Sequence, residues 1–495
     1  MNTRPLDVRR SGVLLHISSL ASRYGLGDLG HEAYRFVDFL QAAGCSVWQV
    51  LPLVPPSRDL SPYNAISVHA GNPAFISIDW LRDRNWVDDK WAEQLVDGTL
   101  DRQQVLELAA ERFYASLHTQ PDWALALNEF CDEHVWLDDF ADFVSIRERE
   151  GYRPWTDWPQ PLRDREPQAI AEARSTCATR IAGIRFEQFV FFKQWQELKA
   201  YAAARNVLFF GDIPIFVAHD SADVWSQRDQ FRLDEEGRPT VVTGVPPDYF
   251  AEHGQRWGNP HYNWSLMAAD DFSWWRARMR SQRGLFDLIR IDHFRGFAAC
   301  WEIPAIEPTA IGGRWIPGPG DRLLDAIGQE VGEGVLIAED LGIITEDVTA
   351  LRLRHEMPGM LVLQFAFDGD SGNLYLPHNH TSLNVCYTGT HDNDTTAGWF
   401  DGLGDDQKAS VYEYLNRSSE PMPWALIRAA LASVSVLAVV PVQDLLGLGS
   451  EDRMNIPGVP DGNWRWQMAA DALSDALAAD LRGLNEMYGR LTNRG

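Results

Sequence analysis

The sequence of 495 residues is poor in cysteine and in basic side chains. Its five cysteines, Cys45, Cys131, Cys177, Cys300 and Cys386, are odd in number and contain no C-x-x-C pair. This pattern argues against a disulfide framework or a zinc site and is typical of reduced thiols in the cytosol. There are 44 Lys and Arg against 70 Asp and Glu, and the resulting formal net charge of −26 argues against nucleic acid as a partner.

Long hydrophobic runs are also missing. Residues 1–10 are partly basic but include no apolar segment long enough for a secretory signal. The longest apolar region, 425–442, is interrupted by Arg428 and Pro441, so it predicts a core helix followed by a strand rather than a membrane span. We therefore expect a cytoplasmic protein that binds no membrane.

Aromatic residues, by contrast, are abundant. The chain has 20 Trp, 13 Tyr and 23 Phe. Flat rings fill protein cores, and they also stack on the apolar faces of sugars. Core packing accounts for most of them, but a neutral ligand suits this acidic sequence better than an anionic one.

Eight short apolar runs, separated mostly by helical patterns, organise the chain. They lie at residues 12–17, 46–51, 207–214, 286–297, 334–338, 360–365, 384–389 and 435–442. A repeated strand–helix–strand order predicts an α/β protein with a (β/α)8 TIM barrel, a fold that needs about 250 residues. An open doubly wound sheet is the alternative.

The length beyond the barrel predicts inserted, mainly helical subdomains after strands 2 and 3. The first covers about residues 55–184 and is acidic, with aromatic residues spaced for packing. The second covers about residues 215–280 and includes the Gly-, Pro- and aromatic-rich segment 243–260, which we interpret as a loop that acts as a lid. We interpret residues 1–495 as a single catalytic barrel with these insertions.

Residues 25–30 match the dinucleotide fingerprint G-x-G-x-x-G letter for letter. A true fingerprint follows its strand at once and is answered by an acidic residue at the end of the next strand. Here seven residues separate Ile17 from Gly25, and the next strand runs into Pro52 without an acid. We therefore predict no nucleotide cofactor.

Acidic residues follow three of the predicted strands. Asp292, Glu339 and Asp392 lie at the ends of strands four, five and seven. Because a barrel of this kind gathers its chemistry where strands end at the C-terminal face, we expect the three carboxylates to converge. Arg290 shares a strand face with Asp292 and would keep it ionised. Each carboxylate taken alone could instead be a structural ion pair at a strand end.

Three converging carboxylates suit the cleavage of a glycosidic bond. Retaining cleavage needs two carboxyl groups about 5–5.5 Å apart, one to attack carbon and one to protonate the leaving oxygen. Asp292 is the candidate nucleophile. Glu339, with Asp292 and Asp392 as anionic neighbours, would have a raised pKa and could act as the acid. Asp392 would orient sugar hydroxyls and stabilise the transition state.

Ten segments between residues 24 and 466 carry a family resemblance. They are 24–30, 61–63, 211–215, 245–250, 255–260, 290–296, 338–342, 390–393, 443–449 and 463–466. Together they resemble the 4-α-glucanotransferases of the amylomaltase (disproportionating enzyme) family, glycoside hydrolase family 77. The resemblance covers nearly the whole chain.

The resemblance implies transfer of α-1,4-glucan segments between malto-oligosaccharide donors and acceptors, without a metal or an organic cofactor. The implied route is a retaining double displacement through a covalent glucosyl-enzyme intermediate. Asp292 resembles the family's nucleophile, Glu339 its general acid/base and Asp392 its transition-state stabiliser. The family's substrate-binding or supporting positions match Tyr63, Asp212, Tyr249, Phe250, Trp257, Arg290 and His391. Tyr249 and Phe250 resemble the tip of a loop that arches over bound glucan.

Three positions depart from the family pattern. Asn64 stands where Gln is usual, His261 where Leu is common, and Gln467 where a second Arg is common. We expect such changes to shift acceptor preference. Two other functions stay open, an α-amylase-like glycoside hydrolase on the same barrel and a non-catalytic glucan-binding protein. The sequence leaves the oligomeric state open between monomer and dimer.

Overall fold

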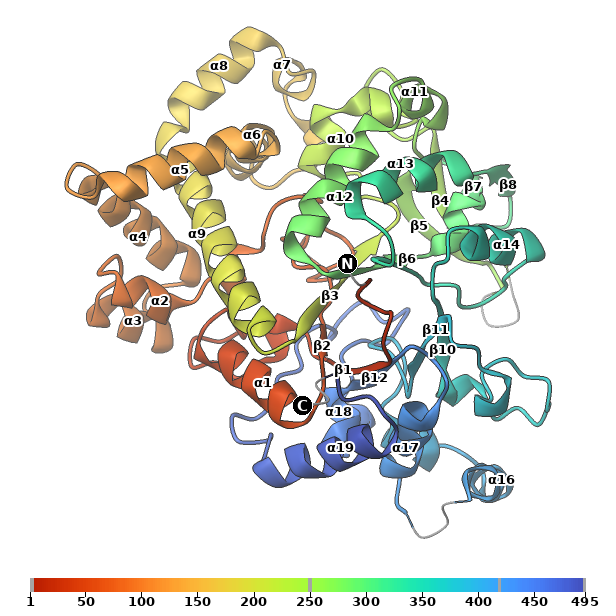
Figure 1. The fold of residues 1–495 in the computed structure, drawn as a ribbon. Coiled ribbons are helices and arrows are strands. Elements are labelled where there is room, and N and C mark those ends of the chain that lie inside the picture. The colour runs from red at the N-terminus through yellow and green to blue at the C-terminus, as the bar shows by residue number, and fades with distance from the viewer. Residues whose placement is uncertain (1–3, 248–251, 417–419, 493–495) are drawn as a thin grey trace.

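Eight parallel strands form a barrel in the computed structural model (Figure 1), which describes residues 4–247, 252–416 and 420–492. The barrel strands are β1 (Arg10–Leu14), β2 (Val47–Gln49), β3 (Leu208–Pro214), β6 (Leu288–Asp292), β9 (Leu336–Ala338), β10 (Gly359–Val362), β11 (Asn384–Tyr387) and β12 (Leu437–Pro441). They pair in the order β10-β11-β12-β1-β2-β3-β6-β9. The amide of Ala338 donates to the carbonyl of Pro358 at 2.9 Å and brings β9 beside β10. The predicted (β/α)8 fold is confirmed, and the open sheet is wrong.

The barrel strands are short and almost wholly buried because they are covered on both faces. Leu14, Phe210 and Leu288 belong to the cluster inside the barrel, whereas their chain neighbours pack against the outer helices. Gly12 allows β1 to approach β2 closely, since a Cβ at this position would lie 2.7 Å from the carbonyl oxygen of Val47. Alternation along each strand therefore separates the inner core from the outer core.

Helices surround the barrel. They include α1 (His31–Ala42), α9 (Ala178–Ala203), α12 (Ser273–Leu285), α13 (Asp321–Val331), α14 (Glu346–Arg354), α15 (Thr396–Asp401), α16 (Asp405–Leu415), α17 (Trp424–Ala432), α18 (Val442–Leu445) and α19 (Asp475–Met487). No helix in the described ranges is both long and apolar enough to cross a membrane. A cytoplasmic location stays a prediction.

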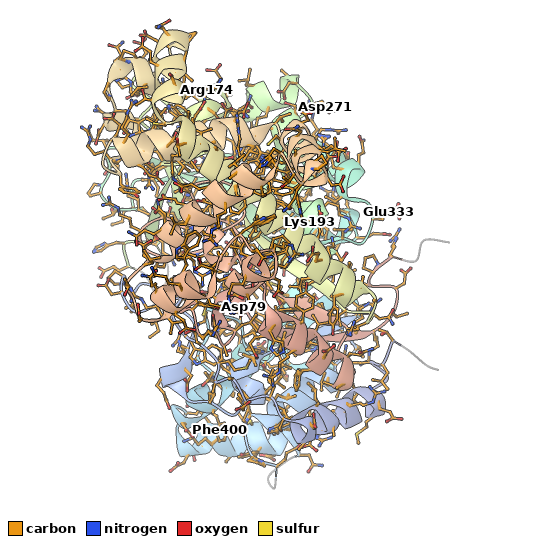
Figure 2. The ribbon with its side chains drawn as sticks, turned by 90° about the vertical axis from the view of Figure 1, so that its left-hand side faces the viewer. Asp79, Arg174, Lys193, Asp271, Glu333 and Phe400 are labelled. Carbon is orange, nitrogen blue, oxygen red and sulfur yellow. The ribbon has the colours of Figure 1, made fainter. Side chains whose placement is uncertain are left out.

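The segment between β2 and β3 is helical. Its helices are α2 (Ile78–Asp83), α3 (Asp89–Val96), α4 (Arg102–Ser116), α5 (Pro121–Glu133), α6 (Trp136–Arg149), α7 (Gln160–Arg163) and α8 (Pro167–Thr176). Helix α9 lies between this segment and the barrel, so side chains on most of its faces are buried. Figure 2 views this side of the molecule, from Arg174 of α8 to Phe400 of α15. The boundaries 55–184 stay a prediction.

A second, antiparallel sheet lies on the other side of the barrel in Figure 1. Its order is β5-β4-β7-β8, with β4 (Val241–Val245), β5 (Gln255–Pro260), β7 (Ala299–Pro304) and β8 (Arg314–Pro317). The interpretation of 243–260 as a loop is therefore wrong for the paired residues. Val241, Val242 and Thr243 are β-branched and favour a strand, but the partner β7 lies far along the chain.

The segment after β3 is thus mixed rather than mainly helical. It contains α10 (Ala222–Ser226) and α11 (Trp264–Ala269) beside the two strands β4 and β5. The other two strands of the second sheet follow β6, where the sequence predicted no insertion. The outer limits 215–280 stay a prediction.

Candidate active site

A cleft of about 570 Å³ opens at the C-terminal ends of the barrel strands. Its lining includes Tyr63, Trp257, Asp292, Asp392 and Trp464, which come from distant parts of the chain. This volume lies within the range of small-ligand sites. The strand ends thus bring together side chains that the sequence separates by hundreds of residues.

Arg290 is the centre of the charged group at the floor of this cleft. Its Nη1 lies 2.6 Å from Asp212 Oδ2 and its Nη2 lies 2.9 Å from Asp292 Oδ1. Asp212 on β3 pairs with Arg290 on β6, and Asp292 lies two residues after Arg290 on the same strand. All three side chains therefore lie on the same face of the sheet. Burial alone would lower the pKa of Arg290, but the two carboxylates raise it well above its usual value. Arg290 is a permanent cation.

Asp292 is the predicted nucleophile, and 32% of its side chain remains exposed in the cleft. Loss of solvation by the surrounding protein raises the pKa of Asp292 to about 6. The charge of Arg290 opposes this rise, and the charge of Asp212 adds to it. Arg290 therefore divides its charge between two carboxylates. Asp292 is still mostly ionised at neutral pH because its pKa remains below 7.

Glu339 follows β9 and is held by two backbone amides. The amide of His293 donates to Oε2 at 2.7 Å, and the amide of Leu341 donates to Oε1 at 2.9 Å. His293 has a left-handed backbone, with φ of 57°, which turns the chain directly after Asp292 into the short helix η5 (Phe294–Phe297). The residue that follows the predicted nucleophile thus binds the predicted acid.

The pKa of Glu339 is raised to about 7, first by burial and then by the negative charge of Asp292, while Arg290 and the two amides oppose the rise. The sequence predicted a raised pKa but attributed it to anionic neighbours alone. Because Glu339 has the higher pKa of the two carboxyls, it is the favoured site for a shared proton.

Asp392, His391 and Tyr63 form a hydrogen-bonded chain on the adjoining wall. Tyr63 donates its hydroxyl proton to Asp212 Oδ2 at 2.8 Å, and its oxygen lies 2.9 Å from His391 Nε2. The same nitrogen lies 3.2 Å from Asp392 Oδ2. Burial would raise the pKa of Asp392, but His391 and Asn455 lower it below its usual range. Asp392 is therefore an anion throughout the neutral range.

Two residues that contact Asp392 were not found from the sequence. Asn455 donates its Nδ2–H to Asp392 Oδ1 at 2.6 Å, and Arg453 donates to the Asp392 carbonyl at 3.0 Å. Both lie in an irregular segment after α18, where no strand end or motif marked them. Trp464, whose ring lies 5.9 Å from that of Tyr63, belonged to a recognised motif but had no predicted role.

Three predicted substrate contacts remain, Trp257, Tyr249 and Phe250, and the structure describes only Trp257. Trp257 on β5 is 39% exposed and lines the cleft, with its ring edge-to-face against His293 at 4.8 Å. Tyr249 and Phe250 lie outside the described residues. The structure therefore brings Tyr63, Asp212, Trp257, Arg290 and His391 to the three carboxylates, and the predicted roles of these residues stay predictions.

Comparison with known proteins gives the family. A family model described as 4-alpha-glucanotransferase matches residues 15–473. The chain belongs to the 4-α-glucanotransferase family. A 4-alpha-glucanotransferase of Thermus thermophilus is 47% identical over 98% of this chain and 99% of its own length. The chloroplastic/amyloplastic enzyme of Solanum tuberosum is 44% identical over 98% of this chain and 87% of its own.

A solved structure supports the same assignment. The amylomaltase from Streptococcus agalactiae in complex with acarbose superposes with a TM-score of 0.93 at 37% identity, covering 97% of this chain and 99% of that one. The resemblance to the amylomaltase family is thereby confirmed over nearly the whole chain.

The three departures from the 4-α-glucanotransferase pattern have different surroundings. His261 is fully buried and donates to the carbonyl of Val242 at 3.2 Å, within the second sheet. Gln467 donates to the carbonyl of Gly25 at 2.6 Å and ties the C-terminal segment to the first loop. Asn64 bonds to Asp59, a residue that lines the cleft. Asn64 thus contacts a residue of the cleft lining, and its effect on acceptor preference stays a prediction.

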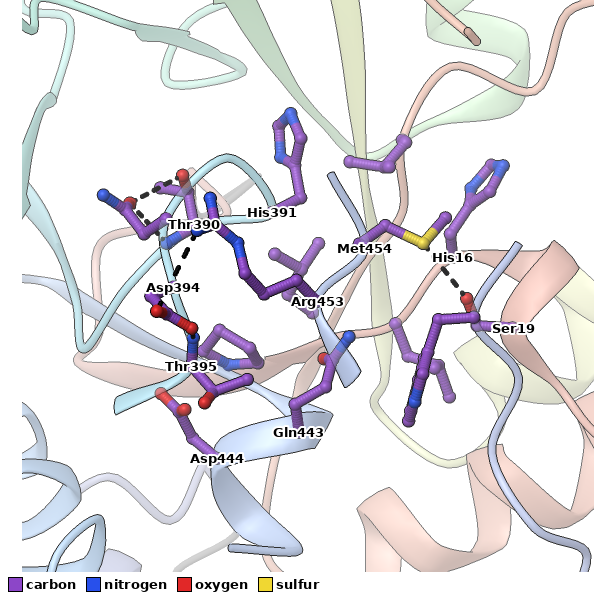
Figure 3. Close-up of a pocket in the computed structure, with 16 residues that line it drawn as sticks. His16, Ser19, Thr390, His391, Asp394, Thr395, Gln443, Asp444, Arg453 and Met454 are labelled. Atoms are coloured by element: carbon purple, nitrogen blue, oxygen red, sulfur yellow. Dashed lines mark hydrogen bonds and ion pairs between the residues drawn. The ribbon is translucent and has the colours of Figure 1, made fainter. Parts of the chain in front are cut away.

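A small, partly open cavity lies beside His391 (Figure 3). Its volume of about 30 Å³ is enough for a single water molecule. Within the described chain His16 Nδ1 has no hydrogen-bond partner there, and burial together with His391 lowers the pKa of His16 to about 3. His16 is thus neutral, and Asp392 is the group that raises the pKa of His391 against its burial.

The described part of the chain contains no candidate metal site. No cluster of three or more His, Cys, Asp or Glu side chains among residues 4–247, 252–416 and 420–492 is arranged to hold a metal ion. A reaction without a cofactor stays a prediction.

Proposed function

We propose that this protein is a 4-α-glucanotransferase that moves α-1,4-linked glucan segments between malto-oligosaccharides with retention of configuration. The observation that carries the proposal is the link between the two reacting carboxyls. Asp292 is paired with Arg290, and the next residue along the chain gives its amide to Glu339. Family membership supports the choice of substrate.

In the first step the carboxylate of Asp292 attacks the anomeric carbon of the donor. The proton on Glu339 passes to the glycosidic oxygen, so the leaving sugar departs with a neutral hydroxyl. The transition state carries positive charge on the ring oxygen and anomeric carbon. The permanently ionised Asp392 faces the same cleft and stabilises that charge.

In the second step the acceptor's hydroxyl gives its proton to Glu339 as its oxygen attacks the same carbon and releases Asp292. The electrostatics favour this exchange. While Asp292 is an ester it carries no charge, so the anion that helped raise the pKa of Glu339 is gone, whereas Arg290 remains. The pKa of Glu339 is therefore higher before the first step, when Glu339 must hold a proton. It is lower while the ester exists, when Glu339 must be ionised to accept one.

The cleft walls supply sugar contacts. Tyr63, His391 and Asp392 present a hydroxyl, an imidazole and a carboxylate in one connected row, which suits the hydroxyls of the unit at the reacting carbon. Trp257 and Trp464 offer ring faces for neighbouring sugars. Tyr249 and Phe250, which lie outside the described residues, are proposed to contact the bound glucan.

The reaction products test this proposal. Incubation with maltotriose should give free glucose together with a ladder of longer oligomers, resolved by chromatography. Shorter sugars alone, with new reducing ends, would mean that the protein is a hydrolase.

A second measurement tests whether the carboxyls act in turnover. The variants Asp292→Asn and Glu339→Gln should lose turnover by about a thousandfold or more while still binding glucan in calorimetry. Binding without turnover in the unaltered protein would mean a non-catalytic glucan-binding protein.

A further inference from the structure

The loop 57–64, which follows β2 and includes Tyr63, is a closed turn. The amide of Ser57 donates to the carbonyl of Asn64 at 2.7 Å, and the amide of Leu60 donates to the carbonyl of Ser57 at 3.2 Å. A β-bridge between Pro56 and Ala65 closes its base. Leu60 has a φ of 62°, a left-handed conformation that is costly for a branched side chain and is held here by the turn.

This turn fixes the carboxylate of Asp59. The side-chain amide of Asn64 donates to Oδ2 at 2.8 Å, and the backbone amide of Ser61 donates to Oδ1 at 3.2 Å. Both donors are neutral and both belong to the same loop. Asp59 is exposed and lines the cleft that also holds Asp292 and Trp257.

The remaining hydrogen-bonding capacity of Asp59 points to a ligand with hydroxyl donors. A carboxylate has about four lone-pair sites, and the two loop bonds leave the others free to accept. Hydrogen bonds to a charged acceptor are about twice as strong as neutral ones, which suits an uncharged sugar whose hydroxyls donate. An exposed carboxylate held in one orientation also loses little side-chain entropy on binding.

We propose that Asp59 binds the hydroxyls of a glucosyl unit beyond the one joined to Asp292, and that Asn64 is its positioning residue. This inference rests on the function proposed above. The hydrogen bonds of Asp59 stay within its loop, whereas Tyr63, His391 and Asp392 are bonded to one another around the reacting carbon. Asp59 therefore sets preference for longer glucans rather than the rate of the chemical step.

Steady-state kinetics on two chain lengths test the assignment. For Asp59→Ala, the KM for maltoheptaose should rise about tenfold, since one charge-assisted contact is lost, while kcat stays within about twofold. The KM for maltotriose should change far less. Asn64→Ala should give a smaller rise of the same kind because the carboxylate remains but loses its orientation.

The control is Asp122→Asn, which removes one negative charge from the exposed start of α5 and should leave both KM values unchanged. A rise in the KM of Asp59→Ala that is equal for both sugars, or an unchanged KM for both, would overturn the assignment. A fall in kcat with unchanged KM would do so as well.

A binding measurement separates this inference from the proposed function. In calorimetry, the double variant Asp292→Asn/Asp59→Ala should bind maltoheptaose about tenfold more weakly than Asp292→Asn alone. If the unaltered protein forms no oligomer ladder, the transferase proposal fails whatever Asp59 does. If it forms the ladder and the two variants bind maltoheptaose equally, only the assignment of Asp59 is lost.

Discussion

The pH dependence of transfer follows from the two carboxyls that the proposed reaction uses, Asp292 and Glu339. In the proposed reaction Asp292 acts as a carboxylate, so activity should be lost as pH falls through its pKa of about 6. Glu339 is proposed to act first as an acid, so activity should be lost as pH rises through its pKa of about 7. The profile of kcat/KM should therefore be a narrow bell centred near about pH 6.5.

The size of the effect follows from these two values. With pKa values of about 6 and about 7, roughly 60% of the enzyme is correctly protonated at the optimum and about a tenth is at pH 8. Beyond pH 8 the rate should fall about tenfold for each unit. The two limbs belong to the carboxyl pair and not to either residue alone.

A donor with a good leaving group separates the two limbs. Fluoride departs without a proton. With maltosyl fluoride as donor and formation of the maltosyl-enzyme as the limiting step, the basic limb should therefore disappear while the acid limb remains. The assay is the initial rate of fluoride release from pH 4.5 to 9. A basic limb that persists with the fluoride donor would refute the assignment of Glu339 as the acid, and a profile flat from pH 5 to 8 would refute the reasoning for both residues.

Two further changes test other parts of the structure. Asn455→Ala should lower kcat/KM for maltotriose by about tenfold or more, because the hydrogen bond to Asp392 is lost. Asn455→Gln should restore less than half of the lost kcat/KM. Unchanged kinetics in Asn455→Ala would show that Asp392 does not need this hydrogen bond. Gly12→Ala should reduce the free energy of unfolding by about 2 kcal/mol, because the added Cβ would collide with the carbonyl of Val47. The measurement is urea denaturation. An unchanged midpoint would contradict the close approach of β1 to β2.

The barrel could be predicted from the sequence because each of its strands is a local signal. The apolar runs at β1, β2, β3, β6, β9, β10, β11 and β12 are short, bounded by turn residues, and separated by helical patterns. The second sheet could not be predicted in the same way. Its strand β4 pairs with β7, and a pairing between segments so far apart leaves no periodic pattern in the sequence.

Site residues at strand ends could be predicted from the sequence, whereas those in irregular loops could not. Asp292, Glu339 and Asp392 were predictable because they follow recognisable strands, and a barrel brings strand ends together. Asn455 and Asp59 were not, because each lies in an irregular loop whose path depends on tertiary contacts. The electrostatic reasoning was incomplete for a related reason: burial, the largest influence on the pKa of both Asp292 and Glu339, is not visible in the order of residues.

The left-handed turn at His293 also affects how the two carboxyls keep their spacing. The amide that holds Glu339 belongs to the peptide unit that begins at the carbonyl of Asp292, and a peptide unit is planar and stiff. The two carboxyl-bearing residues are thus connected across neighbouring strands by one peptide unit and one hydrogen bond.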